Sequence, residues 1–169
     1  MAIVSTDLKY YLSGGAGNAV PDSSLGGVIS TTEVVDNTSH NLFDQVSGAE
    51  TTDGDTNYRC IYLKNTHGSL VLQSATTFLQ SIGINADTDV SIGLAPEGKN
   101  GTAQDTADEA VEPSSVVWET GIGSANSLSL GDMGAGDTYP IWVRRVVGAA
   151  SSAFTDDTFT IEFDGDTAA

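Results

Sequence analysis

One segment of the chain nearly matches the glycine-rich loop that binds phosphate groups in nucleotide-binding proteins. Residues 93–100 read Gly-Leu-Ala-Pro-Glu-Gly-Lys-Asn, so both glycines and the lysine have the required spacing. Asn100 stands where a Ser or Thr would bind magnesium, and Pro96 and the acidic residues behind it do not begin an apolar helix. We therefore expect a turn after a strand here, with no nucleotide or other cofactor bound.

A second segment resembles the first half of a calcium-binding loop, in which oxygen ligands alternate along the chain. Residues 53–57 read Asp-Gly-Asp-Thr-Asn and place oxygen-bearing side chains at alternate positions. Tyr58 stands where that loop needs glycine, and Lys64 stands where it needs its final acid. The pattern excludes an EF-hand and favours a polar turn before a strand. We expect no metal site, and the sequence leaves open an irregular calcium site in this turn.

Paired carboxylates and two histidines are the remaining candidates for catalysis. The close pairs are Asp87 with Asp89, Asp156 with Asp157, and Asp164 with Asp166. They fall in turns at predicted strand ends, where solvated Asp is common, whereas glycoside hydrolysis needs two carboxyls across a cleft. His40 and His67 belong to no metalloprotease or serine-hydrolase motif, so we expect hydrogen-bonded structural roles for them. We predict no catalytic residue and no enzymatic activity.

The composition describes an acidic chain. Its 169 residues include 23 acidic and 6 basic side chains, for a formal net charge of −17. This charge repels nucleic acid and anionic membranes, so we expect neither as a partner, and no stretch approaches the roughly 18 apolar residues that span a membrane. Cys60 is the only cysteine, which excludes an intrachain disulfide and a thiolate zinc cluster. Its apolar neighbours predict a buried, inert thiol.

Residues 57–163 carry a clear β signal. Runs of strand-forming residues recur at a spacing of about ten residues. These runs are 58–64, 69–72, 76–79, 89–94, 116–118, 128–130, 138–147 and 158–163. In the last run Phe159, Ile161 and Phe163 alternate with polar residues and share one face. We predict an all-β fold, an antiparallel β-sandwich of Ig-like or jelly-roll-like type, with Trp142 in its core.

Residues 1–56 differ from the rest, because they are rich in Gly, Ser, Asp and Asn and contain few apolar clusters. The short clusters are 9–12, which is a strand candidate, 26–30, and 41–46. We predict an extended N-terminal arm with long loops over 1–56 and a β-sandwich domain over 57–169. The acidic loop 96–114 within that domain is long enough to be either functional or mobile.

Apolar side chains of the arm and arginines of the strands are the candidates for binding a partner. They are Tyr10, Tyr11, Leu12, Leu42, Phe43, Arg144 and Arg145. In an acidic protein such bases pair with acids of the same chain or of a partner. Arg144 and Arg145 are adjacent in a strand and point to opposite faces, so at least one should be outward.

Five segments, in order along the chain, resemble a group of structural proteins from tailed-phage virions. They are Asp7-Leu-Lys-Tyr-Tyr-Leu-Ser-Gly-Gly-Ala-Gly-Asn18, Ser24-Leu-Gly-Gly-Val-Ile-Ser30, His40-Asn-Leu-Phe-Asp44, Tyr58-Arg-Cys-Ile-Tyr-Leu-Lys-Asn-Thr-His67 and Ile141-Trp-Val-Arg-Arg145. The resemblance implies a subunit associated with the capsid or the tail. Size, acidity and architecture favour a capsid decoration (cement) protein on the capsid exterior, which binds the major capsid protein as a trimer or dimer. An acidic protein outside the shell also avoids the packaged DNA.

Two other functions fit the sequence. One is a component of the tail, neck or head fibre. The other is a carbohydrate-binding adhesin module, which needs an exposed aromatic platform and for which Trp118 and Tyr139 are the candidates. If the arm attaches a decoration protein to the shell, deletion of residues 2–25 should abolish attachment and leave the sandwich folded.

Overall fold

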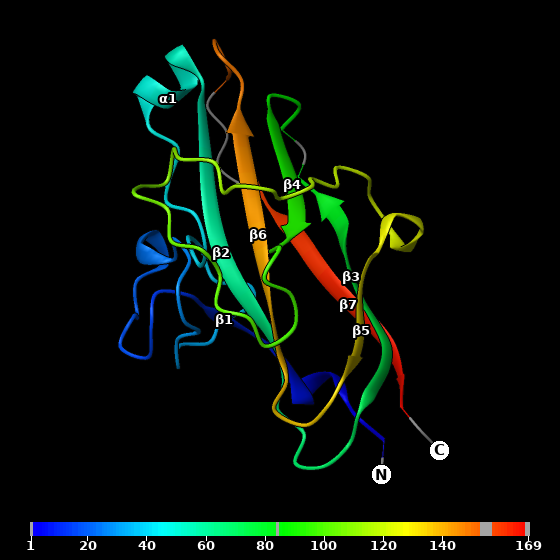
Figure 1. The fold of residues 1–169 in the computed structure, drawn as a ribbon. Helices are drawn as coiled ribbons and strands as arrows, with labels where there is room; N and C mark the ends of the chain where they lie inside the picture. Colours follow the sequence, from blue (N-terminus) through cyan, green and yellow to red (C-terminus); the bar gives the residue numbers. More distant parts are fainter. Residues whose placement is uncertain (1, 84, 153–156, 168–169) are drawn as a thin grey trace.

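Seven strands in the described residues form two antiparallel sheets that face each other (Figure 1). The computed structural model describes residues 2–83, 85–152 and 157–167. The larger sheet has the order β1 (Leu8–Leu12), β2 (Asp55–Asn65), β6 (Thr138–Val147), β4 (Thr88–Leu94), and the smaller one has the order β5 (Leu128–Met133), β3 (Leu72–Ile82), β7 (Phe159–Thr167). The predicted all-β antiparallel sandwich is confirmed.

In the part of the chain that the structure describes, helical structure is limited to short segments before or between the strands. They are η1 (Ser5–Asp7), η2 (Pro21–Ser23), α1 (Gly48–Asp53) and η3 (Ser124–Asn126). The helix α1 begins with a capping box, in which the Ser47 hydroxyl accepts from the Glu50 amide and the Glu50 carboxylate accepts from the Ser47 amide. Among the described residues, no helix is long and apolar enough to cross a membrane.

The main core lies between the two sheets. Ile61 and Leu63 of β2, Ile141 and Val143 of β6, and Leu79 of β3 are almost completely buried there. Alternation along each strand directs these side chains to the same face of their sheet. Full burial of each such side chain stabilises the fold by roughly 1.5–3 kcal/mol.

A second apolar layer covers the opposite face of the larger sheet. Tyr58, Cys60, Tyr62 and Trp142 form its centre and are buried beneath residues 13–35 and 95–119. In Figure 1 the light-green trace of the second segment crosses β2 and β6. Strand β2 is therefore buried on both faces, and its residues 57–63 form an unbroken buried run where a half-exposed strand would alternate.

The close approach of this covering segment depends on Gly93 in β4. A Cβ at this position would lie 2.8 Å from the Val117 carbonyl oxygen and closer still to the Val116 side chain. Since real Cβ atoms do not approach that closely, any other residue would push the segment off the sheet. The first glycine of the phosphate-loop pattern thus has a packing role.

The N-terminal segment packs on the sandwich, so the prediction of an arm that reaches away from it is corrected. Residues 8–12 pair with residues 61–65 as the outer strand of the larger sheet, and residues 30–34 in turn cover the free edge of β1. Leu8 and Leu12 are buried in the main core. Strand β2 begins at Asp55, before the predicted boundary. Deletion of residues 2–25 should therefore unfold the sandwich, contrary to the sequence-based expectation.

Two predicted strands are also different in the structure. Runs 69–72 and 76–79 contribute to one strand, β3, which is bulged near Ser74, a residue with a φ of 51°. Residues 116–118 form no strand, because Ser115 is in the left-handed region at φ 63° and the backbone pairs with β4 only at Glu119.

Tyr62 joins the two covering segments. Its hydroxyl donates to the Gly27 carbonyl at 2.6 Å and accepts from the Ala103 amide at 2.9 Å. Burial raises the pKa of Tyr62 to about 12, whereas an unfolded tyrosine titrates near pKa 10. Between these values the unfolded chain loses this proton first, so the contribution of Tyr62 to the free energy of unfolding should fall as pH rises, by at most about 1.4 kcal/mol per pH unit.

Tyr62→Phe should flatten that decline while lowering stability at neutral pH, because it removes the proton and both hydrogen bonds. Urea unfolding at pH values from 9 to 12, in steps of about one unit, measures the pH dependence of stability and the stability itself. If the free energy of unfolding falls with pH equally steeply for Tyr62→Phe and the original chain, Tyr62 does not cause the decline.

Cys60 should be chemically inert in the folded protein. The thiol is completely buried, and burial raises its pKa well above the ordinary value, so it stays protonated at mildly alkaline pH. We expect an aromatic disulfide reagent at about pH 8 to react only as the chain unfolds, and at once in denaturant. Rapid labelling of the native protein would show that the covering segments open readily.

Candidate partner-binding site

Four of the seven predicted partner-binding residues lie inside the chain's own structure. Leu12, Leu42 and Phe43 are buried in the main core, and Arg145 is buried at its end. The prediction that these side chains are presented on the surface is therefore corrected. Local sequence patterns do not reveal this burial, because the residues that these side chains contact lie far away along the chain.

The other three predicted residues are half-buried. The Tyr10 hydroxyl lies 3.1 Å from Thr77 Oγ1 and its ring packs against Phe163, so Tyr10 also faces the main core. Tyr11 lies on the opposite face of β1, under the Lys64 ammonium group. Arg144 lies on the covered face of β6 and is described with the groove below.

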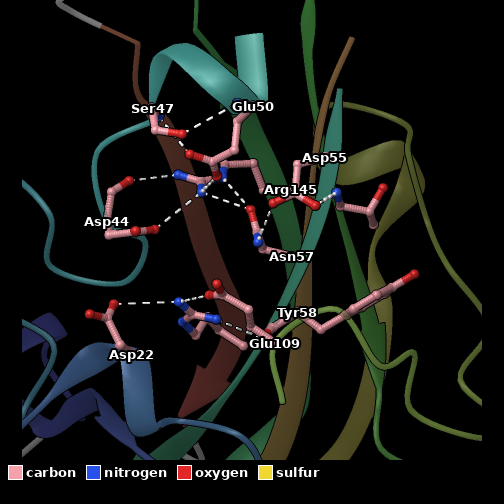
Figure 2. A network of polar contacts seen from close by, with 11 residues as sticks. Asp22, Asp44, Ser47, Glu50, Asp55, Asn57, Tyr58, Glu109 and Arg145 are labelled. Atoms are coloured by element: carbon pink, nitrogen blue, oxygen red, sulfur yellow. Dashed lines mark hydrogen bonds and ion pairs between the residues drawn. The ribbon is translucent and has the colours of Figure 1, made fainter. Parts of the chain in front are cut away.

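Arg59 is a completely buried cation in β2 that binds two separate loops. Its Nη2 donates to the carboxylates of Glu109, in a short contact, and Asp22, at 3.4 Å, while Nη1 donates to the Tyr58 carbonyl (Figure 2). The Tyr58 amide donates to the Glu109 carbonyl at 2.8 Å. The pairing fastens the edge of β2 that β1 leaves uncovered.

Arg145 repeats this arrangement at the end of β6. It donates to Asn57 Oδ1 at 2.8 Å and to both the carbonyl and the carboxylate of Asp44, and its Nη2 lies 3.6 Å from a Glu50 oxygen (Figure 2). The Phe43 ring lies between the two arginines, 5.4 Å from the Arg59 guanidinium and 4.8 Å from that of Arg145. We call these residues, with Asp22 and Glu109, the arginine network.

All six basic side chains of the sequence contact groups of the same chain. Beyond the arginine network, Lys9 pairs with Glu33 at 2.7 Å and Lys99 with Asp137 at 3.5 Å. Lys64 and Arg144 lie over the rings of Tyr11 and Trp118. The expectation that the bases in the strands pair with acids holds within the chain for Arg59 and Arg145, whereas Lys64 and Arg144 contact aromatic rings. The positive charge is thus used internally, and the excess of carboxylates determines the sign of the surface.

An apolar groove of about 330 Å³ lies where β4 ends, beside the covering segment 115–119. Its walls include Leu94, Pro96, Val117, Trp118, Leu128 and Tyr139, with Glu119 among the polar groups. Val117 is 82% exposed, the most exposed large apolar side chain described. The groove brings together Trp118 and Tyr139, the two residues proposed from the sequence as an aromatic platform.

Trp118 is held firmly within this groove. The Arg144 guanidinium lies 4.9 Å from the ring centre and also donates to Ser91 Oγ, and the Tyr58 ring packs at 5.6 Å. The indole N–H donates to Glu112 at 2.8 Å. Because Arg144 covers one face of the ring, Trp118 offers less open area than a sugar-stacking platform would.

The phosphate-like segment forms a turn after β4, as expected, whereas residues 53–57 are the end of α1, Gly54 and the start of β2, and not a separate polar turn. Lys99 donates to the Asp132 carbonyl, and Asn100 exchanges hydrogen bonds with Asp137 and the Thr138 amide, which ties the phosphate-like loop to the turn between β5 and β6. The Asp55 carboxylate accepts from the Thr56 amide and the Asn57 side chain. In the described ranges, no three His, Cys, Asp or Glu side chains gather as a metal-binding group.

The remaining catalytic candidates have local structural contacts. His67 Nδ1 accepts from the Ser69 and Leu70 amides, which confirms a hydrogen-bonded structural role. The Asp87 carboxylate accepts from the Ser152 amide, and the Asp164 carboxylate accepts from the Gly165 amide. Asp156, of the pair Asp156–Asp157, lies outside the described residues.

Comparisons with known proteins found no family model, curated protein or solved structure that matches the chain. The function therefore has to be inferred from the chain's own residues and their arrangement.

Proposed function

We propose that the chain is a structural subunit of a tailed-phage virion, a decoration or cement protein that binds and stabilises the outside of the capsid. The observation that carries the proposal is an acidic sandwich in which every basic side chain contacts a group of the same chain. The proposed partner is the major capsid protein, with the chain acting as a trimer or dimer.

The distribution of charge supports a role outside the DNA-filled shell. The formal net charge is −17, and each basic side chain already contacts a group of the same chain. No basic side chain therefore remains to bind the phosphates of DNA. Such a surface repels packaged DNA while remaining able to bind a protein of opposite charge.

The segments that resemble virion proteins support the same role. Residues 7–18, 24–30, 40–44, 58–67 and 141–145 contribute strands of the larger sheet, part of its cover and part of the arginine network. Those segments therefore specify a sandwich with tightly fastened loops. A capsid cement needs such a body, because a rigid surface loses little conformational entropy on binding.

The test is sedimentation of the purified chain with empty shells assembled from the major capsid protein of the same virus. We expect the chain to pellet with the shells at saturable occupancy and to raise the temperature at which they disassemble, because a ligand of the assembled state stabilises that state. Absence of the chain from the pellet would exclude capsid decoration and leave the tail, neck or head fibre as its place in the virion.

A carbohydrate-binding module is the second candidate, because Trp118 and Tyr139 line one groove. Sugars stack on exposed aromatic faces, and the partial cover of Trp118 by Arg144 argues against this use. A glycan-array signal that is lost on Trp118→Ala and kept on Val28→Ala would favour the adhesin over the cement protein.

A further inference from the structure

We infer that the groove beside residues 115–119 is the docking site for a loop of the shell protein that presents an apolar side chain next to a lysine or arginine. The inference rests on the proposed function and adds the contact surface and the chemistry of the partner's loop to it. Three properties of the groove support it: an exposed apolar side chain, a fixed shape and negative charge.

The first property is apolar exposure at a concave site. Val117 is 82% exposed at the groove, and Ile122, 50% exposed, follows in the same stretch of chain. Single exposed valines are ordinary on protein surfaces, but apolar exposure at a groove lined by aromatic side chains is typical of a binding site. A protruding apolar side chain would cover Val117 and fill the groove.

The second property is that the groove is preformed. The Ile92 and Glu119 backbones exchange two hydrogen bonds, at 2.8 and 3.1 Å, and Trp118 is fixed by Glu112 and Arg144. Gly93 allows the segment to lie directly on β4. A site that is already ordered spends little binding free energy on ordering itself.

The third property is the charge around the groove. Glu119 lines it, and Glu112 holds the indole of Trp118. Arg144, which contacts Trp118 and Ser91, offsets one of these two negative charges and leaves the site acidic. Two copies that met at this groove would bring their Glu112 and Glu119 side chains close together, so the proposed trimer or dimer has to use another face. A partner loop with a basic residue beside its apolar side chain matches the groove.

The experiment measures binding of three full-length variants to the same empty shells. Val117→Glu should weaken binding about tenfold or more, since it places a charge in a buried apolar contact. Val28→Glu is the matched control, because it makes the same change at an exposed valine (55%) on another loop, and its affinity should stay within about twofold. Equal thermal midpoints establish that both variants fold.

Glu112→Gln tests the charge separately. The amide oxygen still accepts from the Trp118 indole while the negative charge is gone, so binding should weaken a few-fold and lose part of its dependence on salt. An increase in affinity for Glu112→Gln would overturn the basic partner loop.

The outcomes separate this inference from the proposed function. If the original chain and Val117→Glu bind shells equally well, the docking site is wrong and the decoration role stands. If Val117→Glu and Val28→Glu weaken binding to the same extent, the effect is general charge repulsion and the docking site is again wrong. If the original chain does not bind shells, the proposed function and this inference both fall.

Discussion

Arg59→Ala should lower the free energy of unfolding by about 2–5 kcal/mol, the range expected when a large buried side chain is truncated to alanine. The side chain is completely buried, and its guanidinium is the group that holds Asp22 and Glu109 to β2. Its loss removes the packing of the stem, charged hydrogen bonds and the attachment of two covering segments. Urea unfolding of the variant and the original chain measures the difference.

Lys9→Ala is the matched control for Arg59→Ala. The Lys9–Glu33 pair has a short distance of 2.7 Å but is partly exposed to solvent. Exposed ion pairs contribute little to stability, so this variant should unfold almost like the original chain. A similarly small loss of unfolding free energy for both variants would show that Arg59 does not hold the loops of Asp22 and Glu109 to β2.

A double-mutant cycle with Glu109→Ala tests the attachment itself. Glu109→Ala leaves Arg59 buried with Asp22 as its remaining acidic partner, which should cost on the order of 2 kcal/mol. Both substitutions detach the same segment. The sum of the losses in unfolding free energy for the two single variants should therefore clearly exceed the loss for the double variant. Simple additivity would contradict a direct coupling between the two residues.

Trp142→Ala should cost about 3–5 kcal/mol, as truncation of a buried aromatic side chain does. Trp142 is completely buried in β6, at the centre of the layer between the larger sheet and its cover. It pairs with Cys60 on one side and with Gly93 on the other, so the cavity would lie between three strands. Thermal or urea unfolding gives the value directly.

Trp142→Phe separates the ring from its polar atom. The indole Nε1 is buried and has no hydrogen-bond partner, so phenylalanine removes an unsatisfied donor as well as volume. We expect a clearly smaller loss than for Trp142→Ala. A thermal shift near zero for Trp142→Ala would contradict the burial of this layer.

Much of the fold could be predicted from local patterns. The alternation of Phe159, Ile161 and Phe163 in β7 corresponds to half-buried residues between exposed ones. The run of strand-forming residues 58–64 also predicts a strand, and the burial of β2 on two faces explains why its apolar residues do not alternate with exposed polar ones. Side-chain periodicity is a property of neighbouring residues, so one sequence is enough to reveal it.

The contacts that assemble the site could not be predicted in this way. Arg145 binds Asp44, 101 residues earlier, and Arg59 binds Glu109, 50 residues later. Both arginines were expected to pair with acids, but the sequence offers 23 of them and no local rule selects one. The partners are set by which loops the finished sheet brings near each strand.

The N-terminal segment shows the same limitation. Residues 9–12 were recognised as a strand candidate, yet their partner in β2 begins nearly fifty residues later, across a polar stretch that resembles a linker. Similarly, Phe43 is a candidate for partner binding in the sequence alone. Its position between two arginines is not predicted, because both arginines belong to strands that lie later in the chain. An isolated apolar cluster does not reveal whether its partner is its own chain or another.

The most direct test of the decoration role is the copy number of the chain in purified virions, measured by quantitative mass spectrometry against the major capsid protein. A protein that covers the capsid surface should be present in on the order of hundreds of copies, in a fixed ratio set by the symmetry of the shell. About six to a few dozen copies would place the chain in the tail, neck or head fibre, and its absence from virions would contradict a structural role in the particle.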